Sequence, residues 1–306
     1  MKRFSDISNL AEINGPVHLA IGVFDGVHLG HQKVIARALD GANRDRGNAV
    51  VITFDPHPGE VLRPGGAPAR LTPLPIQESV LERLGVDFLL AVPFTPKFSE
   101  VGAADFVHQL AAACNPLRRI CIGYDWRFGK GREGDVHLLA DLGREYGFEV
   151  TALPAVEAGD IEVRSTRIRE AISEGNLELA NTLLGRFHIL SGTVVEGKHL
   201  GRSIGFPTAN LELSTPVVPP FGVYAVDVRC GDREFIGVAN YGRRPTVEDG
   251  EPQAIFEVHI IGDEPGDLYG KTLEVGLRRF LRSEKKFSSL EELKAQIGAD
   301  VSQAVR

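Results

Sequence analysis

The chain is poor in cysteine, because only three of its 306 residues, Cys114, Cys121 and Cys230, carry a thiol. The number is odd, and no pair has the Cys-x-x-Cys spacing of a zinc or redox site. The sequence therefore indicates neither a disulfide framework nor a cysteine-based metal site. This cysteine usage fits a reducing compartment, and we expect a cytoplasmic protein.

Long apolar runs and an excess of positive charge are also missing. Residues 1–9 lack the apolar centre of a signal peptide, and no uninterrupted apolar run approaches the length that crosses a bilayer. The 34 basic and 41 acidic residues give a net charge of -7, whereas a surface that coats nucleic acid needs a basic face. We expect neither a membrane nor a nucleic acid as a partner; small anionic ligands remain compatible, and the oligomeric state stays open.

What is present is the composition of an ordinary globular protein, with 43% hydrophobic and 25% charged residues. The length suffices for two domains that each bury a core. The pattern of the sequence changes after Gly185, so we place the domains at residues 1–185 and 186–306.

Short apolar runs alternate with helix-length segments in the first domain. Asn176 can cap the last helix, and Gly185 can end it. Strands that alternate with helices predict an α/β fold with a doubly wound parallel sheet. The expected strands cover residues 17–23, 49–54, 88–92, 119–124 and 148–153, and the expected helices cover residues 32–40, 75–84, 103–112, 135–146 and 167–173.

The second domain shows several short strands without helices between them, a pattern that predicts an antiparallel β-barrel or sandwich; we expect the barrel. A terminal helix follows, for which Ser288 is the expected N-cap. The expected strands of this domain cover residues 189–195, 222–229, 234–240, 254–261 and 272–277.

The most informative segment is residues 22–31, which read Gly-Val-Phe-Asp-Gly-Val-His-Leu-Gly-His between the first strand and the first helix. Glycines let the backbone approach a ligand, and the start of a helix attracts anions. His28 and His31 could be a zinc pair, for which no third ligand is near, or ordinary core histidines. Their position favours hydrogen bonds to a phosphate whose bond is breaking.

This segment resembles the His-x-Gly-His signature of the nucleotidyltransferase superfamily, and its longer form is similar to the bacterial bifunctional riboflavin kinase/FMN adenylyltransferase family. Residues 53–58, 123–129 and 165–169 fit the same family. The resemblance implies catalytic roles for His28, His31 and Arg169. It implies an ATP site formed by Gly22, Phe24, Asp25, Gly30, Ser165 and Thr166, and a flavin site formed by Asp55, Pro56, Pro58 and Asp125.

Two features of the first domain allow more than one interpretation. The family usually has a serine before Ser165, where this chain has Arg164; the guanidinium could replace the hydroxyl by charge or point to solvent. Residues 129–134 match Gly-x-Gly-x-x-Gly, the fingerprint of dinucleotide binding, and Glu149 follows at a suitable distance. The match falls late in the sheet, however, whereas the fingerprint normally occupies a first strand-to-helix turn.

In the second domain the most informative segment is residues 205–210, Gly-Phe-Pro-Thr-Ala-Asn. Thr208 and Asn210 offer hard oxygen ligands that suit Mg2+, although Pro-Thr-x-Asn alone also reads as a turn. The preceding glycine-rich residues 197–202 could cover ATP phosphates. A carboxylate such as that of Glu257 could take the proton of an attacking hydroxyl.

The order and spacing of these segments resemble riboflavin kinase. The resemblance implies that Thr208 and Asn210 hold Mg-ATP together with Gly201, that Glu257 is the base, and that Arg282 binds flavin. Residues 260–266 depart from the family pattern, so the loop before Asp267 could differ in shape.

Together these observations predict an enzyme that phosphorylates riboflavin to FMN and adenylylates FMN to FAD, with ATP and Mg2+ at two sites. Two alternatives remain. Only one half could be active, with Arg164 or the altered loop marking the impaired half. The chain could also be a flavin- or nucleotide-binding regulator without turnover. The presence of His28, His31, Thr208, Asn210 and Glu257 argues against the regulator, because binding alone does not need a base.

Overall fold

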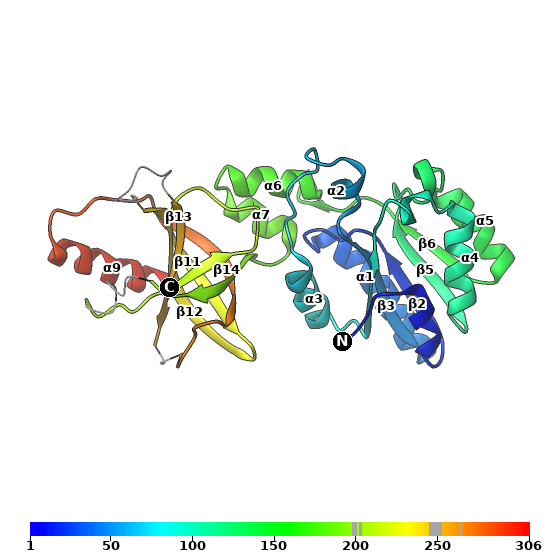
Figure 1. The fold of residues 1–306 in the computed structure, drawn as a ribbon, viewed down its shortest axis with the longest axis horizontal. Helices are drawn as coiled ribbons and strands as arrows, with labels where there is room; N and C mark the ends of the chain where they lie inside the picture. Colours follow the sequence, from blue (N-terminus) through cyan, green and yellow to red (C-terminus); the bar gives the residue numbers. More distant parts are fainter. Residues whose placement is uncertain (198–200, 202–203, 245–252, 263–264) are drawn as a thin grey trace. The chain divides into compact units, whose positions relative to one another are not determined.

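The computed structural model describes residues 1–197, 201, 204–244, 253–262 and 265–306 (Figure 1). The chain forms two compact units. The first unit contains Met1–Ala69 and Gln77–Arg164, and the second contains Arg70–Ile76 and Ser165–Arg306. Each unit is described by itself below.

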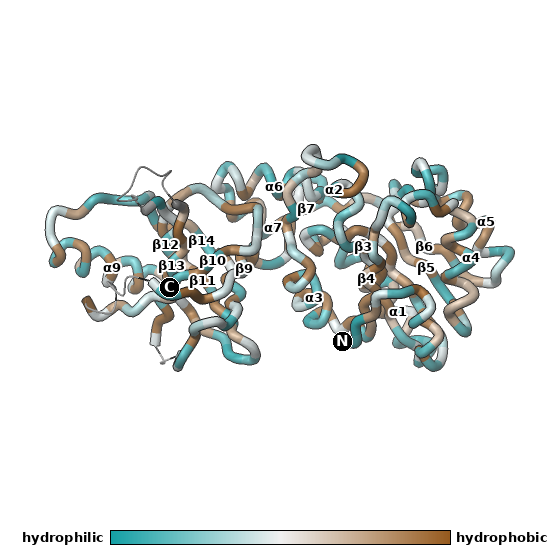
Figure 2. The backbone as a smooth tube through the Cα atoms, in the orientation of Figure 1, coloured by the Kyte–Doolittle hydropathy of each residue, from teal (hydrophilic) through white to brown (hydrophobic). Residues whose placement is uncertain are grey.

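The first unit is built on a six-stranded sheet in the order β1-β4-β3-β2-β5-β6, in which every neighbouring pair is parallel. Apolar side chains fill both faces of its central strands, as a buried parallel sheet requires, and Figure 2 shows these strands as hydrophobic stretches. The strands are β1 (Lys2–Phe4), β2 (Val17–Ile21), β3 (Asn48–Asp55), β4 (Phe88–Pro93), β5 (Leu117–Gly123) and β6 (Glu149–Leu153).

Helices cover the two faces of this sheet. Helix α1 (Leu29–Asp45) packs on β2, β3 and β5. Helices α4 (Ala103–Ala113) and α5 (Val136–Tyr146) share one apolar core with Leu19, Ile52 and Ile122 on the other face. The remaining elements are the 3-10 helices η1 (Ile7–Glu12), η2 (Phe98–Glu100) and η3 (Lys130–Arg132), helices α2 (Pro58–Leu62) and α3 (Leu74–Arg83), and the small strands β7 (Glu157–Ala158) and β8 (Ile161–Glu162).

The second unit contains a closed antiparallel barrel in the order β10-β13-β12-β11-β14-β9. Helices α6 (Ser165–Ser173) and α7 (Leu177–Leu184) precede it, and α7 packs on β9 and β14. The strands are β9 (His188–Val195), β10 (Ala209–Leu213), β11 (Gly222–Cys230), β12 (Arg233–Arg244), β13 (Gln253–Ile261) and β14 (Thr272–Arg282).

The terminal helix α9 (Leu290–Ala304) packs on the outside of the barrel against β11, β12 and β14. Its N-cap is Ser289, whose side chain accepts a hydrogen bond from the Glu292 amide. The expectation of Ser288 as the cap was wrong by one residue, because Ser288 instead donates from its amide and its hydroxyl to the Glu292 carboxylate.

The predicted fold class is confirmed, with a parallel α/β sheet followed by an antiparallel barrel and a terminal helix. The expected caps of α7 are also confirmed, since Asn176 accepts from the Leu179 amide and Gly185 adopts φ 66° at the helix end. The compact units divide at Arg164/Ser165, so α6 and α7 group with the barrel. A domain boundary at residue 185 stays a prediction.

Candidate active sites

The strand order of the first unit sets the position of a ligand crevice. From β2 the chain adds β3 and β4 on one side and then crosses to place β5 on the other side. Ligands of open α/β sheets bind outside the carboxyl ends of the strands at such a switch point. Gly22 follows β2 and Tyr124 follows β5 at this point, so the predicted nucleotide motif lies at the switch point of the sheet.

The turn after β2 has an unusual backbone. Phe24, Gly26 and Val27 adopt φ values of 52°, 92° and 42°. The left-handed region is costly for a β-branched residue such as Val27, and such strain concentrates at functional sites. Phe24 is almost fully buried, and its ring lies 3.2 Å from where a Cβ on Gly22 would stand. A side chain at position 22 would therefore displace the turn.

The two histidines stand at the start of α1. His28 is the N-cap, and its Nδ1 accepts a hydrogen bond of 3.4 Å from the His31 amide. The neutral tautomer that accepts at Nδ1 carries its proton on Nε2, so that nitrogen can donate to a ligand. The His28 and His31 rings stack with centroids 3.5 Å apart. Gly30 permits this arrangement, because a Cβ there would lie 3.2 Å from the His28 ring.

The electrostatics of the site favour a neutral His31. Burial, and then the charge of His28, lower the pKa of His31 well below its ordinary value of 6.5. Its Nδ1 is buried and has no hydrogen-bond partner within the described part of the chain. The same part holds no group of three His, Cys, Asp or Glu residues arranged to bind a metal. The arrangement thus suits donation of hydrogen bonds to an anion, and nothing in it supports a zinc pair.

The predicted flavin residues of this unit lie along the same edge of the sheet. Asp55 ends β3, Pro56 follows it, and Pro58 is the first residue of α2. Asp125 folds back over Gly123 at the end of β5, with an oxygen 3.4 Å from where a Cβ would be. The sequence analysis assigned no role to a group of aromatic residues whose rings contact one another: Phe54, Phe94, Phe98, Phe106, Trp126 and Phe128.

The Gly-x-Gly-x-x-Gly segment does not form a dinucleotide fingerprint. Its first and last glycines, Gly129 and Gly134, pack against Ala103, where a Cβ would come within 2.8 Å. The start of the next helix is occupied by its own N-cap, because the Asp135 carboxylate accepts from the amides of His137 and Leu138 at 3.0 Å. A carboxylate there excludes the pyrophosphate that the fingerprint would bind.

The second nucleotide motif is at the start of α6, in the second compact unit. Ser165 is the first residue of the helix, Thr166 is exposed and Arg169 is half-buried. The departing residue, Arg164, is exposed and forms an ion pair of 2.7 Å with Glu162. Its guanidinium is therefore engaged by a neighbouring carboxylate of the β7–β8 hairpin.

In the barrel, strand register brings the predicted kinase residues together. Asn210 of β10 is the pairing partner of Glu257 on β13, and Glu257 is the partner of Asn240 on β12. The neighbours of Glu257 on β13, Phe256 and Val258, are buried in the barrel core, so Glu257 points to the outer face. Asn210 and Asn240 share that face, because directly paired residues lie on the same side of a sheet. Asn240 is a neighbour to which the sequence assigned no role.

Two glycines of the glycine-rich segment, Gly197 and Gly201, lie close to Asn210 and Thr208. A Cβ on Gly197 would stand 2.1 Å from Asn210 Nδ2, and a Cβ on Gly201 would stand 3.2 Å from Thr208 Oγ1. The Pro207 carbonyl accepts a hydrogen bond of 2.8 Å from His259 Nδ1. The strand that bears Glu257 thus also holds the turn before Thr208. Residues 198–200 and 202 of the glycine-rich segment lie outside the described residues, as do 263 and 264 of the altered loop.

Arg282, the predicted flavin residue of the barrel, is at the end of β14. Its Nε and Nη2 donate to the carboxylate of buried Asp300 on α9 at 2.8 to 3.0 Å. Gln296 donates to the same carboxylate at 2.9 Å. The observed contact of Arg282 is therefore with the terminal helix, and its role toward flavin stays a prediction.

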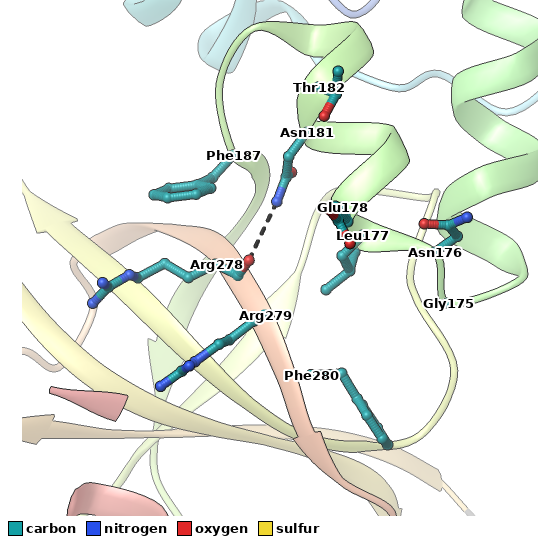
Figure 3. Close-up of a pocket in the computed structure, with 10 residues that line it drawn as sticks. All are labelled: Gly175, Asn176, Leu177, Glu178, Asn181, Thr182, Phe187, Arg278, Arg279 and Phe280. Carbon is teal, nitrogen blue, oxygen red and sulfur yellow. Dashed lines mark hydrogen bonds between the residues drawn. The ribbon is translucent and has the colours of Figure 1, made fainter. Parts of the chain in front are cut away.

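A pocket of about 550 Å³ lies between α7 and β14 (Figure 3). Asn181 at its wall donates to the carbonyls of Leu277 and Arg278 and accepts from the His188 amide. The pocket contains none of the residues that the sequence analysis assigned to a site. Its lining residues are Gly175, Asn176, Leu177, Glu178, Asn181, Thr182, Phe187, Arg278, Arg279 and Phe280.

Two family models match successive parts of the chain. Residues 10–167 match the FAD synthetase family model, and residues 184–306 match the riboflavin kinase model. The bifunctional riboflavin kinase/FMN adenylyltransferase of Escherichia coli K12 is 42% identical over 98% of this chain and 96% of its own length. The Pseudomonas fluorescens enzyme of the same description is 40% identical over 93% of this chain and 90% of its own length.

A solved structure from Streptococcus pneumoniae, described as a macrolide-efflux protein, covers 100% of this chain and 99% of its own length. It has 33% sequence identity and a TM-score of 0.82, so it shares the fold of the whole chain. Among the residues that the structure describes, no helix is both long and apolar enough to span a bilayer.

An α/β unit that matches the FAD synthetase model, joined to a barrel that matches the riboflavin kinase model, defines a transferase that uses ATP. The chain belongs to the bifunctional riboflavin kinase/FMN adenylyltransferase family. It phosphorylates riboflavin to FMN and adenylylates FMN to FAD, and its ligands are therefore flavins and ATP.

Proposed function

We propose that the turn at residues 22–31 is the ATP site of the adenylyltransferase, with His28 and His31 as catalytic residues. The supporting observations are the stacked imidazoles at the start of α1 and the strained turn that precedes them. The ATP-binding residues of this proposal are Gly22, Phe24, Asp25, Gly30, Ser165 and Thr166, with Arg169 acting on the phosphates. Asp55, Pro56, Pro58 and Asp125 are the proposed flavin contacts.

The chemistry needs no covalent intermediate on the protein. A phosphate oxygen of FMN attacks the α-phosphorus of ATP, the bond to the β-phosphate oxygen breaks, and pyrophosphate leaves. The protein aligns the reactants and stabilises the charge that develops on the phosphate oxygens. His28 can donate from Nε2, because its Nδ1 accepts from the His31 amide.

For the kinase reaction we propose Glu257 as the base and Thr208, Asn210 and Gly201 as the ATP-binding residues. The 5′-hydroxyl of riboflavin attacks the γ-phosphorus of ATP, ADP leaves, and the Glu257 carboxylate takes the hydroxyl proton. The pairing of Asn210 with Glu257 across neighbouring strands supports this role, because it brings an ATP ligand and a base to one face of the barrel.

The donor set of this face fits Mg2+. The hydroxyl of Thr208 and the amide oxygen of Asn210 are the hard ligands that Mg2+ prefers, and Mg2+ takes its remaining ligands from phosphates and water. When bound, the ion neutralises phosphate charge. Thr208 and Asn210 hold and orient that complex, and Gly197 leaves the room that the Asn210 side chain occupies. Arg282 is the proposed flavin contact of this half.

The observation that carries the proposal is that the two histidines and Glu257 fall in different compact units. Variants should therefore separate the two activities. Purified protein is incubated with ATP, Mg2+ and either riboflavin or FMN, and the flavins are then separated. His28→Ala should convert riboflavin to FMN but make no FAD, and Glu257→Gln should convert FMN to FAD but leave riboflavin unchanged.

Other outcomes would select the alternatives. FMN alone from the unaltered chain would mean that only the kinase half is active. Unchanged riboflavin and FMN would identify a binding protein without turnover. Normal FAD formation by folded His28→Ala would remove that histidine from the mechanism, and loss of both activities in Glu257→Gln would indicate unfolding.

We also propose a cytoplasmic location, supported by three free thiols, two of which are buried with their pKa raised to about 12 by burial. A boundary near residue 185 between the two functional domains is supported by the family matches, which end at residue 167 and begin at residue 184.

A further inference from the structure

Two buried side chains from other elements hold the carbonyl groups of the turn that follows β2. Thr53 of β3 donates from Oγ1 to the Val23 carbonyl at 2.8 Å. Gln77 of α3 donates from Nε2 to the carbonyls of Val23 at 3.0 Å and Phe24 at 3.2 Å. The Gln77 amide is also 3.4 Å from Thr53 Oγ1, so the two side chains form one small network.

Both side chains lie in the interior of the protein. Thr53 is 0% exposed and Gln77 is 5% exposed, and a buried polar group without a partner is costly. On the α1 side, Gln32 donates to the Val27 carbonyl at 2.8 Å. The strained turn is therefore held at both ends by side-chain amides and a hydroxyl.

The direction of these carbonyls fixes the direction of the neighbouring amides. The peptide bonds after Val23 and Phe24 are trans, and in a trans peptide the C=O and the following N–H point in opposite directions. Because the Val23 and Phe24 carbonyls point to Thr53 and Gln77, the N–H groups of Phe24 and Asp25 point away from that network. Successive backbone N–H groups that turn to one side form a concavity that binds anions.

We propose that Gln77 and Thr53 are positioning residues for adenylyl transfer. They hold the Val23 and Phe24 peptides so that the Phe24 and Asp25 amides face the ATP phosphates beside His28. This inference rests on the proposed assignment of the ATP site to residues 22–31. It adds two residues that do not touch substrate and that act through the backbone of the turn.

The test compares variants that keep side-chain volume and change only the hydrogen bond. Thr53→Val and Gln77→Leu remove the donors, whereas Thr53→Ser keeps the hydroxyl and is the matched control. The kcat of FMN adenylylation should fall about tenfold to a hundredfold in Thr53→Val and Gln77→Leu, the effect of a small misplacement of catalytic groups. The KM for FMN should stay unchanged, because the lost interaction acts in the transition state.

The kinase activity of each variant is the internal standard, because Glu257 lies in the other compact unit. Riboflavin phosphorylation should stay at the level of the unaltered chain, and Thr53→Ser should retain most FAD formation. An unaltered adenylylation kcat in Thr53→Val and Gln77→Leu overturns the inference, and so does an equal loss in Thr53→Ser and Thr53→Val. His28→Ala, assayed in parallel, tests the underlying site: if that variant is fully active, the proposed ATP site fails, whatever the Thr53 and Gln77 variants do.

Discussion

The imidazole rings of His28 and His31 lie face to face, with centroids 3.5 Å apart and planes inclined by 19°. Two positive charges at this separation repel strongly, so the pair does not accept two protons near neutral pH. Burial of His31 acts in the same direction and is the larger cause of its lowered pKa. The His31 ring beside His28 is therefore neutral.

The first prediction concerns the charge of His31. Because its pKa is held well below 6.5, the ring should stay neutral as the pH falls from 7.5 to 6, a range in which an ordinary histidine begins to charge. Imidazole nitrogen shifts in NMR spectra of the labelled protein report this directly. A His31 titration centred near pH 6.5 would contradict the prediction.

The second prediction concerns Gly30. In Gly30→Ala the new Cβ would lie 3.2 to 3.3 Å from the His28 ring and would push it from its stacked position. We expect adenylylation to fall about tenfold, since a small displacement of a catalytic group has effects of this size. Riboflavin phosphorylation should be unchanged. Gly298→Ala is the matched control, because no atom lies within 4 Å of a Cβ there.

The third prediction concerns Gly197, which lies against Asn210 in the barrel unit. A Cβ in Gly197→Ala would stand 2.1 Å from Asn210 Nδ2, so the Asn210 side chain must move. We expect the kcat/KM for riboflavin phosphorylation to fall at least about tenfold, because a proposed Mg-ATP ligand is displaced. FMN adenylylation serves as the internal reference. Equal losses of both activities would instead indicate a general folding defect.

The sequence predicted the sheet and the barrel because their strands are apolar runs between clear turn residues. It missed β1, whose three residues Lys2–Phe4 carry no apolar pattern, although they pair with β4. It also missed β10, because the strand begins within the Pro-Thr-x-Asn segment, which alone also reads as a turn. Both elements depend on partners distant in the chain, which local periodicity does not reveal.

The candidate sites also contain some residues that a local motif reveals and others that depend on partners distant in the chain. His28 and His31 were predicted because their glycines and helix start form one local motif. Gln77 was not, because a single glutamine on an amphipathic helix carries no local signal, and its acceptors are 53 and 54 residues away. Local sequence also does not explain why residue 197 is a glycine. A glycine is needed there because the Asn210 side chain packs against the backbone.

The fourth prediction concerns His259, which donates from Nδ1 to the Pro207 carbonyl. His259→Phe keeps a ring against Phe206 but removes this donor, and the turn before Thr208 loses one anchor. We expect riboflavin phosphorylation to fall about threefold to tenfold, as expected for a net hydrogen bond of about 1 kcal/mol. His259→Asn places an amide nitrogen near the Nδ1 position and should restore most of the rate. If the two variants are equally impaired, the hydrogen bond is not the cause.

The fifth prediction links pH to the stability of the barrel unit. Burial lowers the pKa of His188 to about 4, from 6.5 in the unfolded chain. Between these values the unfolded chain binds the proton and the folded chain does not, so stability is complete above pH 6.5 and falls as the pH drops towards 4. The shift corresponds to about 3 kcal/mol.

Urea unfolding at pH 7 and pH 4 measures this effect against His188→Gln, whose amide can still donate to the Val217 carbonyl. The unaltered chain should lose about 3 kcal/mol more than the variant over this range. Parallel losses in the two proteins would exclude His188 as the source.

The strand order of the first unit also determines when both edges of β2 can be paired during synthesis. Strand β2 is hydrogen-bonded on one side to β3 and on the other to β5, which begins only at Leu117. Until β5 has emerged from the ribosome, the edge of β2 on that side has no partner. The histidine motif follows directly after this unpaired strand. Such edges attract other chains, so β5 protects the edge of β2 as well as extending the sheet.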